Sequence, residues 1–343
     1  MNDTERAVDV LIVGAGIAGL SAACFAARAG RRVTIVDDGA HRASDLPIAL
    51  VNPLRGHTGR VIADGVAGMR ATFALIGTLR EAGHAIAAGR GLYRPLIDVP
   101  EEAAAEPYWR TRIDGRLAFD WHATAPSSLG LATPVPALYL HDAGWVAPRG
   151  LLDALKAASA AHCIVGRVTR VVADRTGGGT VSLADGSIVE ARALLWCGGA
   201  WGAALLDDDA SPHDALYKPG SLLAVDARLT DAALSFGLYA APWTASIDGG
   251  DRAVTLIGPT REDTQARFPD TAVPPQAVVH LGDRIARVFG STLQAEAVWR
   301  GVRLARLSSA ASAALGGVST LTALGSRGFL MAPLLAEAWA RSL

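Results

Sequence analysis

A glycine motif directly after a short apolar segment constrains the fold of this chain more than any other feature. Residues 8–13 read VDVLIV and predict a buried strand, and residues 14–19 follow directly with GAGIAG. An alanine-rich helical pattern then runs to a stop at Gly30, and a second apolar strand within RVTIVDD ends at Asp37. Three glycines at this spacing between strand and helix, with an acidic residue about 20 positions on, are typical of a dinucleotide-binding βαβ unit. The N-terminal part therefore predicts dinucleotide binding.

The residues of this motif have separate physical tasks. Gly14 permits the tight turn, Gly16 lets a pyrophosphate approach the backbone, and Gly19 lets helix and strand pack closely. Ile17 and Ala18 within the motif are further candidate cofactor contacts, and the N-terminus of the following helix stabilises the negative charge of phosphates.

The acidic end of the second strand supplies the expected ribose contact. Asp37 continues the strand directly and is expected to accept hydrogen bonds from the ribose hydroxyls, with Asp38 as the alternative. The motif alone does not separate NAD from FAD.

Length and composition exclude several classes of protein. The chain has 343 residues, which suggests two domains or one large α/β unit with an insertion. Half of the residues are hydrophobic, but the apolar stretches end well before the roughly 20 residues of a membrane span. A net charge of −1 lacks the basic footprint of nucleic-acid binding. We expect a soluble, cytoplasmic protein without a signal peptide or a membrane partner.

The cysteines give no sign of a metal site. Cys24, Cys163 and Cys197 are scattered without metal-ligand spacing, so no metal is expected. Cys24 lies in the alanine-rich helix pattern and Cys197 ends an apolar strand, so both are expected to be buried free thiols.

A second turn with two glycines lies in the middle of the chain. A hairpin pattern with a turn at residues 185–186 leads into an apolar strand, 193–197, that ends in two glycines. Such an end allows another close approach to a nucleotide, although a plain strand-to-helix turn is the alternative. The candidate cofactor contacts from this part are Val168, Gly198, Gly199 and Trp201.

The patterning changes after residue 213. Residues 214–260 predict three antiparallel strands, and PPQAVVHLGDRIARVFGS predicts an amphipathic helix. We therefore expect an α/β protein with a Rossmann-type nucleotide domain and a second, α+β domain built on an antiparallel sheet. The expected boundaries are 1–74, 144–212 and 301–343 for the nucleotide domain, and 75–143 and 213–300 for the second domain.

The C-terminal part has a glycine-bearing turn of its own. It reads LTALGSRGFLMAPLLAEAWA, with a buried strand expected at 321–324, a turn with two glycines and then a helix. A plain turn and a close approach to a ligand are both compatible with this pattern.

The chain resembles the flavin-dependent D-amino-acid-oxidase-like family over nearly its full length. The motifs that carry the resemblance are VLIVGAGIAGLSAA, VTIVDD, GWVAPRGLLDAL, LLWCGGAWG, LYAAPW, LIGPTRED and LGSRGFLMAPLLAE. That family includes glycine oxidase, sarcosine oxidase and the oxidase part of a bifunctional tRNA 5-methylaminomethyl-2-thiouridine enzyme. GSRGFLMAPLLAE is most similar to the tRNA-modifying branch.

The resemblance implies FAD as the cofactor and adds contacts to it. Residues 325–329 are expected to wrap the pyrimidine end of the flavin ring, where a positive field stabilises the reduced ring. The loop 41–59 is expected to contact the phosphate or the ring, with Arg55 and His57 as further candidates or bystanders. The absence of a cysteine after Cys197 argues against covalent attachment. The added contacts are Arg42, Ser44, Gly325, Ser326, Arg327, Gly328 and Phe329.

The implied reaction needs anchors for the substrate more than acid–base groups. A hydride moves from the carbon beside an amine nitrogen to flavin N5, the imine hydrolyses, and O2 reoxidises the flavin to give H2O2. Arg303 lies where the family binds a substrate carboxylate, and we prefer it to the neighbouring Arg300 and Arg306. Tyr239 is a second candidate for a hydrogen bond to that carboxylate. The sequence after Arg303, LARLSSAASAALGG, departs from the proline-containing pattern of relatives.

Three functions follow from this resemblance. The first is a small-molecule oxidase with an amino acid or secondary amine and O2 as its partners. The second is removal of a carboxymethyl group from a wobble uridine of tRNA, which the net charge does not favour. The third is a flavin-binding protein that has lost catalysis.

Overall fold

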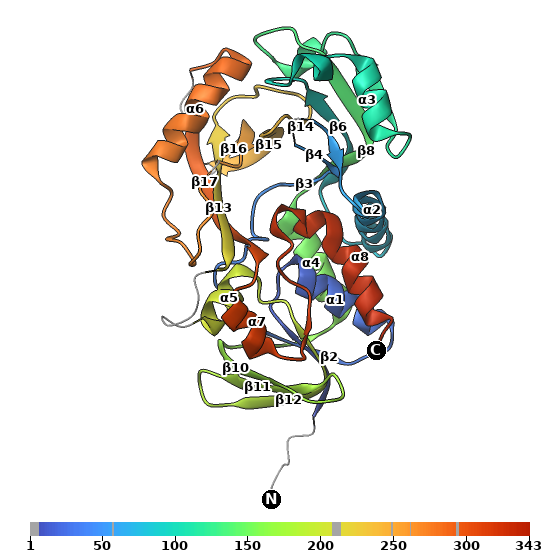
Figure 1. Cartoon of the computed structure of the whole chain (residues 1–343), viewed down its shortest axis with the longest axis vertical. Helices are drawn as coiled ribbons and strands as arrows, with labels where there is room; N and C mark the ends of the chain where they lie inside the picture. Colours follow the sequence, from blue (N-terminus) through green and yellow to red (C-terminus); the bar gives the residue numbers. More distant parts are fainter. Residues whose placement is uncertain (1–6, 57, 208–213, 248–249, 261, 293–294) are drawn as a thin grey trace, which may run out of the picture.

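Two β-sheets organise the computed structural model, which describes residues 7–56, 58–207, 214–247, 250–260, 262–292 and 295–343. Figure 1 shows the seven-stranded sheet at the end of the molecule near the N-terminus and the nine-stranded sheet at the other end. The α/β class and the division into a nucleotide-type sheet and a second sheet are confirmed.

The seven-stranded sheet is parallel around its centre. β1 (Val8–Val13) lies between β2 (Val33–Asp37) and β12 (Ile188–Trp196) and is parallel to both. The strand order is β10–β11–β12–β1–β2–β9, with β18 beside β12. The hairpin β11–β12 has its turn at Asp185-Gly186, as predicted. The remaining strands are β9 (His162–Val165), β10 (Val168–Ala173), β11 (Gly179–Leu183) and β18 (Ser319–Thr320).

Helices cover both faces of this sheet. Alternate residues of β1 enter two separate cores, with Val10 and Ile12 on one face and Leu11 and Val13 on the other. The first face packs against α1, α4 and α8, and the second lies on the side of α7. The helices of this part are α1 (Ile17–Arg28), α2 (Gly65–Glu81), α4 (Pro148–Ser159), α5 (Gly199–Leu206), α7 (Ser309–Leu315) and α8 (Gly328–Ala340).

The nine-stranded sheet has the order β17–β13–β16–β15–β14–β6–β8–β3, with β7 beside β8. The strands predicted between residues 214 and 260 form its antiparallel centre, β13–β16–β15. The amphipathic helix α6 (Pro275–Phe289) packs Leu281 and Ile285 against this part. The strands are β3 (Ala49–Val51), β6 (Ala88–Pro95), β7 (Phe119–His122), β8 (Ala137–Val146), β13 (Leu216–Val225), β14 (Leu234–Ser235), β15 (Tyr239–Ile247), β16 (Gly250–Gly258) and β17 (Ala295–Arg306).

Helix α3, three short 3-10 helices and a small hairpin complete the described elements. Helix α3 (Glu106–Ile113) contacts η1 and β5, and Figure 1 shows it at the same end of the molecule as α6 but on the opposite side. The hairpin pairs Leu54 with Val61 and Arg55 with Arg60. The elements are η1 (Glu101–Ala104), η2 (Ser127–Leu129), η3 (Gly325–Arg327), β4 (Leu54–Arg55) and β5 (Arg60–Val61).

Strand β17 lies at the edge of the nine-stranded sheet, beside β13. It pairs with β13 over its whole length and so crosses the boundary expected at residue 301. Strand β3, which falls in the segment 1–74 expected for the nucleotide domain, also pairs within the nine-stranded sheet, with β8. The domain boundaries themselves stay a prediction. Within the described residues, no helix combines the length and the apolar composition that a membrane crossing requires.

The prediction of a buried strand at residues 321–324 is wrong. In this part of the chain, strand pairing with β12 is confined to Ser319–Thr320, which form β18. The last backbone hydrogen bond to β12 is the one that the Leu321 amide donates to the Trp196 carbonyl, at 2.9 Å. Ala323 then adopts a left-handed conformation, with φ of 55°, which no continuing strand can contain. The chain turns here into η3 and α8.

Helix α8 contains a proline that a distant threonine compensates. Pro333 has no N–H, so the carbonyl of Phe329, four residues earlier, lacks its helical partner. The buried hydroxyl of Thr72 in α2 donates to that carbonyl at 3.0 Å. Gly68, one turn earlier in α2, allows the close approach, because a Cβ there would lie 2.4 Å from the Leu330 carbonyl oxygen.

We predict that Thr72→Val lowers the free energy of unfolding by about 1–3 kcal/mol, because a buried carbonyl loses its donor. Thr72→Ser keeps the hydroxyl and is expected to lose less. Thr78→Val, in the same helix but exposed, is the control and should change stability by less than about 0.5 kcal/mol. Urea denaturation measures all three, and equal stability of the two valine variants contradicts the prediction.

Candidate functional site

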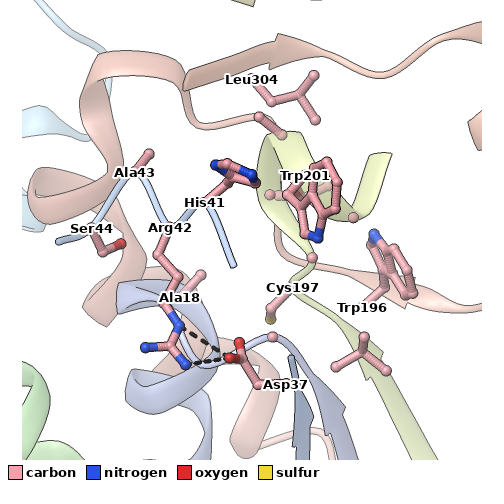
Figure 2. A pocket seen from close by; sticks show the side chains of 18 of the residues that line it. Ala18, Asp37, His41, Arg42, Ala43, Ser44, Trp196, Cys197, Trp201 and Leu304 are labelled. Carbon is pink, nitrogen blue, oxygen red and sulfur yellow. Dashed lines mark hydrogen bonds and ion pairs between the residues drawn. The ribbon is translucent and has the colours of Figure 1, made fainter. Parts of the chain in front are cut away.

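The first of two cavities lies at the carboxyl ends of the central strands. Val13, Val36 and Trp196, the last or next-to-last residues of β1, β2 and β12, line it. Ligands of α/β sheets bind at this edge. Figure 2 shows the cavity with the α1 N-terminus, Asp37 and the turn before α5 around it. The predicted contacts that line it are Gly14, Gly16, Ile17, Ala18, Asp37, Asp38, Arg42, Ser44, Val168, Gly198, Gly199, Trp201, Gly325 and Gly328.

The turn between β1 and α1 has no room for side chains. A Cβ on Gly14 would lie 2.5 Å from the Cys197 carbonyl oxygen, and Gly14 has φ of 101°. A Cβ on Gly19 would lie 1.8 Å from the Gly14 carbonyl oxygen. Gly19 does not line the cavity but holds the helix against the turn, as its predicted packing role requires. Ser44 completes the turn, because its Oγ accepts a hydrogen bond from the Ile17 amide at 3.0 Å.

The carboxylate of Asp37 is held from three directions. It accepts hydrogen bonds from the amides of Ala15 at 2.6 Å and Gly39 at 2.7 Å. Arg42 also donates to it, with its Nε at 3.1 Å, and Figure 2 draws this contact. The hydrogen bond to Asp37 raises the pKa of Arg42. Asp37 thus ties the glycine turn to the loop after β2, and its ribose contact stays a prediction.

An aromatic group lies at one side of this cavity. Trp201 Nε1 donates to Asp38 Oδ2 at 2.9 Å, and the Trp201 and His41 ring centroids are 4.8 Å apart. Phe268 packs on both rings, at 5.4 and 5.7 Å. His41 was not predicted as a contact, because a loop histidine carries no pattern that marks it.

The first cavity fits a dinucleotide with a pyrophosphate. Its glycine turn and helix N-terminus expose backbone where a phosphate group would lie. Thr322 Oγ1 and Trp196 Nε1 are buried without a hydrogen-bond partner among the described residues, and both residues line the cavity. Since buried polar groups are normally paired, polar atoms of a bound cofactor would satisfy them.

The second cavity adjoins the first and has a volume of about 330 Å³. It is built from the nine-stranded sheet, the hairpin β4–β5 and the turn before α8. Six residues line both cavities: Ile17, Ala43, Ser44, Arg303, Gly325 and Gly328. The predicted residues Tyr239, Ser326 and Phe329 line the second cavity only.

Arg303 is the predicted anchor that both cavities share. Its guanidinium donates to the backbone carbonyls of Lys218 and Pro219, each at 3.4 Å, and makes no ion pair with a described residue. Its position away from solvent lowers its pKa, because less water is left to compensate the positive charge. Such a group favours an anionic ligand.

The neighbouring arginines of β17 are occupied differently. Arg300 forms a buried ion pair with Glu262 at 2.7 Å. Arg306 donates to the Asp214 carbonyl at 2.8 Å and lines neither cavity. Of the three candidates, Arg303 alone reaches the cavities.

Tyr239 lies near Arg303 on β15. Its hydroxyl donates to the Ile48 carbonyl at 3.2 Å. Burial raises its pKa, so the hydroxyl stays neutral and acts as a hydrogen-bonding group.

Some predicted residues lie outside the cavities. Arg327 lines neither cavity and is exposed, and its Nε donates to the Leu324 carbonyl at 3.4 Å. A direct contact of Arg327 with the cofactor therefore gains no support from its position. His57 lies outside the described residues.

The sequence also missed an arginine of the second cavity. Arg94, near the end of β6, lines the second cavity, and so does Arg55, which was considered only as a loop candidate. An arginine within the otherwise apolar run LYRPLI was the signal that could have identified Arg94.

Cys24 and Cys197 are buried free thiols as predicted, and Cys163 is exposed.

The chain is similar to known proteins over nearly its full length. Residues 9–342 match the family described as DAO, FAD dependent oxidoreductase. The tRNA 5-methylaminomethyl-2-thiouridine biosynthesis bifunctional protein of Caulobacter vibrioides is 33% identical over 97% of this chain and 54% of its own length. A protein of the same description from Caulobacter sp. is 30% identical over 95% of this chain and 53% of its own. The chain thus spans about half the length of these relatives.

Solved structures share the fold. Glycine oxidase from Bacillus cereus superposes with a TM-score of 0.74 at 20% identity, covering 98% of this chain and 94% of that one. Iminodiacetate oxidase from Chelativorans sp. gives a TM-score of 0.74 at 20% identity, with 96% and 94% covered.

We predict that Gly19→Ala lowers the free energy of unfolding by about 1–3 kcal/mol and reduces the flavin content of the purified protein, because the added methyl displaces the turn. Gly77→Ala in α2 is the matched control. No atom lies within 4 Å of its Cβ position, and it should gain up to about 1 kcal/mol of helix stability. Absorbance at the visible flavin bands and urea denaturation measure both effects. A Gly19→Ala protein with full flavin content and unchanged stability contradicts the packing argument.

Proposed function

The chain belongs to the DAO family of FAD-dependent oxidoreductases, and on this premise we propose that it oxidises the C–N bond of a small amino acid or secondary amine, with FAD bound non-covalently. The observation that carries the proposal is the half-buried guanidinium of Arg303, which lies where the two cavities meet and has no carboxylate partner among the described residues. Its position supports a substrate carboxylate held beside the cofactor.

Arg303 would fix the substrate by its charge and its planar donors. Paired donors of a guanidinium match the two oxygens of a carboxylate, which sets orientation as well as affinity. The backbone carbonyls of Lys218 and Pro219 hold the guanidinium from the side of β13. Tyr239, neutral and buried, would give the substrate a second polar neighbour near Arg303. Positioning of this kind is the main contribution that such a reaction needs from the protein.

The C-terminal turn would support the chemistry by its electrostatics. FAD supplies the hydride acceptor and, through O2, the route by which the electrons leave. The N-terminus of α8 begins at Gly328, and Gly325, Ser326 and Phe329 line the second cavity around it. A helix N-terminus contributes partial positive charge, which stabilises negative charge that develops nearby.

The altered sequence after Arg303 forms regular structure. Strand β17 continues to Arg306, and Ser308 then caps α7, with its Oγ accepting from the Ala311 amide at 2.9 Å. Arg303 keeps its place in the strand, which supports a working enzyme over a protein that has lost catalysis.

A second candidate function has its own observation. The relatives that are 33% and 30% identical are both described as tRNA 5-methylaminomethyl-2-thiouridine biosynthesis proteins. Removal of a carboxymethyl group from a uridine side chain would use the same carboxylate anchor. The net charge of −1 favours the small-molecule function.

We expect a small amine to bleach the bound flavin of the purified protein under anaerobic conditions. The panel holds glycine, sarcosine, several D-amino acids and a carboxymethylaminomethyl-uridine nucleoside. Bleaching by a free amino acid supports the first function, and bleaching by the nucleoside alone supports the second. A yellow protein that none of the compounds reduces contradicts both.

We predict that Arg303→Gln lowers kcat/KM for the active amine by about 30-fold or more, since removal of one partner of a charge pair costs about 2 kcal/mol or more. Arg306→Gln, on the same strand, is the control and should retain activity and flavin content. Stopped-flow flavin reduction gives the rates. Similar rates for the Arg303 and Arg306 variants would remove Arg303 from the site.

A further inference from the structure

Three arginines line the second cavity, and no aspartate or glutamate among the described residues lines it. They are Arg55 on the hairpin β4–β5, Arg94 on β6 and Arg303 on β17. None of the three forms an ion pair with a described residue, whereas Arg42 and Arg300 elsewhere in the molecule pair with Asp37 and Glu262. The cavity therefore carries a positive charge that the described part of the chain does not balance.

Arg55 has the clearest spare hydrogen-bonding capacity. Its Nη2 donates to the Ser326 carbonyl at 2.7 Å, and its Nε is buried without a partner among the described residues. Burial lowers its pKa, and the positive charges of Arg303 and Arg327 lower it further. The contact with Ser326 holds Arg55 against the turn before α8, so the side chain is fixed at the cavity wall.

Arg94 lies deeper and supports this wall. Its side chain is buried, with the residue 4% exposed, and it donates to the carbonyl of Gly56, next to Arg55. Its guanidinium lies over the Trp109 ring at 5.2 Å. Burial lowers its pKa to about 10. Arg94 thus positions the backbone after Arg55 and adds a second positive charge on that side.

We propose that the substrate carries two carboxylates, one bound by Arg303 and the other by Arg55, so that this cavity selects amines with a second acidic group. The inference rests on the proposed function, which assigns the first carboxylate to Arg303. Unbalanced buried charge is costly, and one carboxylate balances only one of three cations. A second carboxylate at Arg55 would occupy its unpartnered Nε and offset the repulsion between Arg55 and Arg303.

A pair of ligands that differ in one carboxylate tests this without turnover. Diglycolate has two carboxylates joined through an ether oxygen, and methoxyacetate has a methyl group in place of one carboxymethyl arm. Isothermal titration calorimetry on the oxidised holoprotein measures both, and the visible flavin spectrum reports binding near the ring. We expect the Kd of diglycolate to be at least about tenfold lower, as for a charge-assisted contact.

Variants of Arg55 separate a substrate role from a cofactor role. Arg55→Gln should bring the ratio of the two Kd values close to one and leave methoxyacetate binding nearly unchanged, while Arg55→Lys should restore part of the ratio. Arg60→Gln is the matched control, because Arg60 pairs with Arg55 across the hairpin, is exposed and lines neither cavity. It should keep the ratio of the wild-type protein.

Turnover gives an independent second readout. N-(carboxymethyl)glycine should be oxidised with a higher kcat/KM than sarcosine, and Arg55→Gln should reverse or abolish the preference. Equal Kd values for the two ligands in the wild-type protein overturn the proposal, as does an Arg55→Gln variant that weakens both ligands equally. If no amine reduces the flavin but diglycolate still binds tenfold tighter, the proposed function fails while the selection of a second acidic group stands.

Discussion

The contact between the backbone at Gly14 and the carbonyl of Cys197 is the constraint on which the site depends. The ends of β1 and β12 approach so closely that a methyl group on Gly14 would overlap the Cys197 carbonyl oxygen, and a methyl group on Gly19 would overlap the Gly14 carbonyl oxygen. The approach fixes the N-terminus of α1 beside the end of β12, and the Asp37 carboxylate ties the same turn to the loop that holds Arg42 and Ser44. The positive end of α1, the glycine turn and the close packing of the strand ends therefore lie together at one edge of the seven-stranded sheet, as expected for a phosphate site.

The second half of the site is assembled from distant parts of the chain. Helix α8 is held on α2 by Thr72 and Gly68, and this sets the turn at Gly325 between the two cavities. Arg55 reaches the same turn through the Ser326 carbonyl. Arg303 lies on β17, which stays paired with β13 to its end at Arg306 and is followed in the chain by α7. The second cavity thus lies between the glycine turn of the first cavity and three arginines that come from separate segments, β4, β6 and β17.

The sequence predicted the elements that local hydrophobic pattern and turn spacing encode. Strand, turn and helix around GAGIAG, the hairpin before β12 and the strands between 214 and 260 are all present, because each is encoded by periodicity and turn residues. Arg303 followed only from resemblance. An arginine in the apolar run LYRPLI could have drawn attention to Arg94, but its place at the cavity depends on β6 meeting the loop after β4, which no local pattern encodes. The strand expected at 321–324 failed because an apolar run does not reveal the left-handed turn at Ala323.

The central claim is that the unpaired guanidinium of Arg303 is a carboxylate site next to the cofactor. A crystal structure of the holoprotein with methoxyacetate tests it most directly. The account predicts both carboxylate oxygens within hydrogen-bond distance of the Arg303 guanidinium, with the ligand between it and the flavin ring. Glu262 is near enough to influence the pKa of Arg303. An Arg303 side chain turned away to pair with Glu262, with the carboxylate bound elsewhere, would contradict the account.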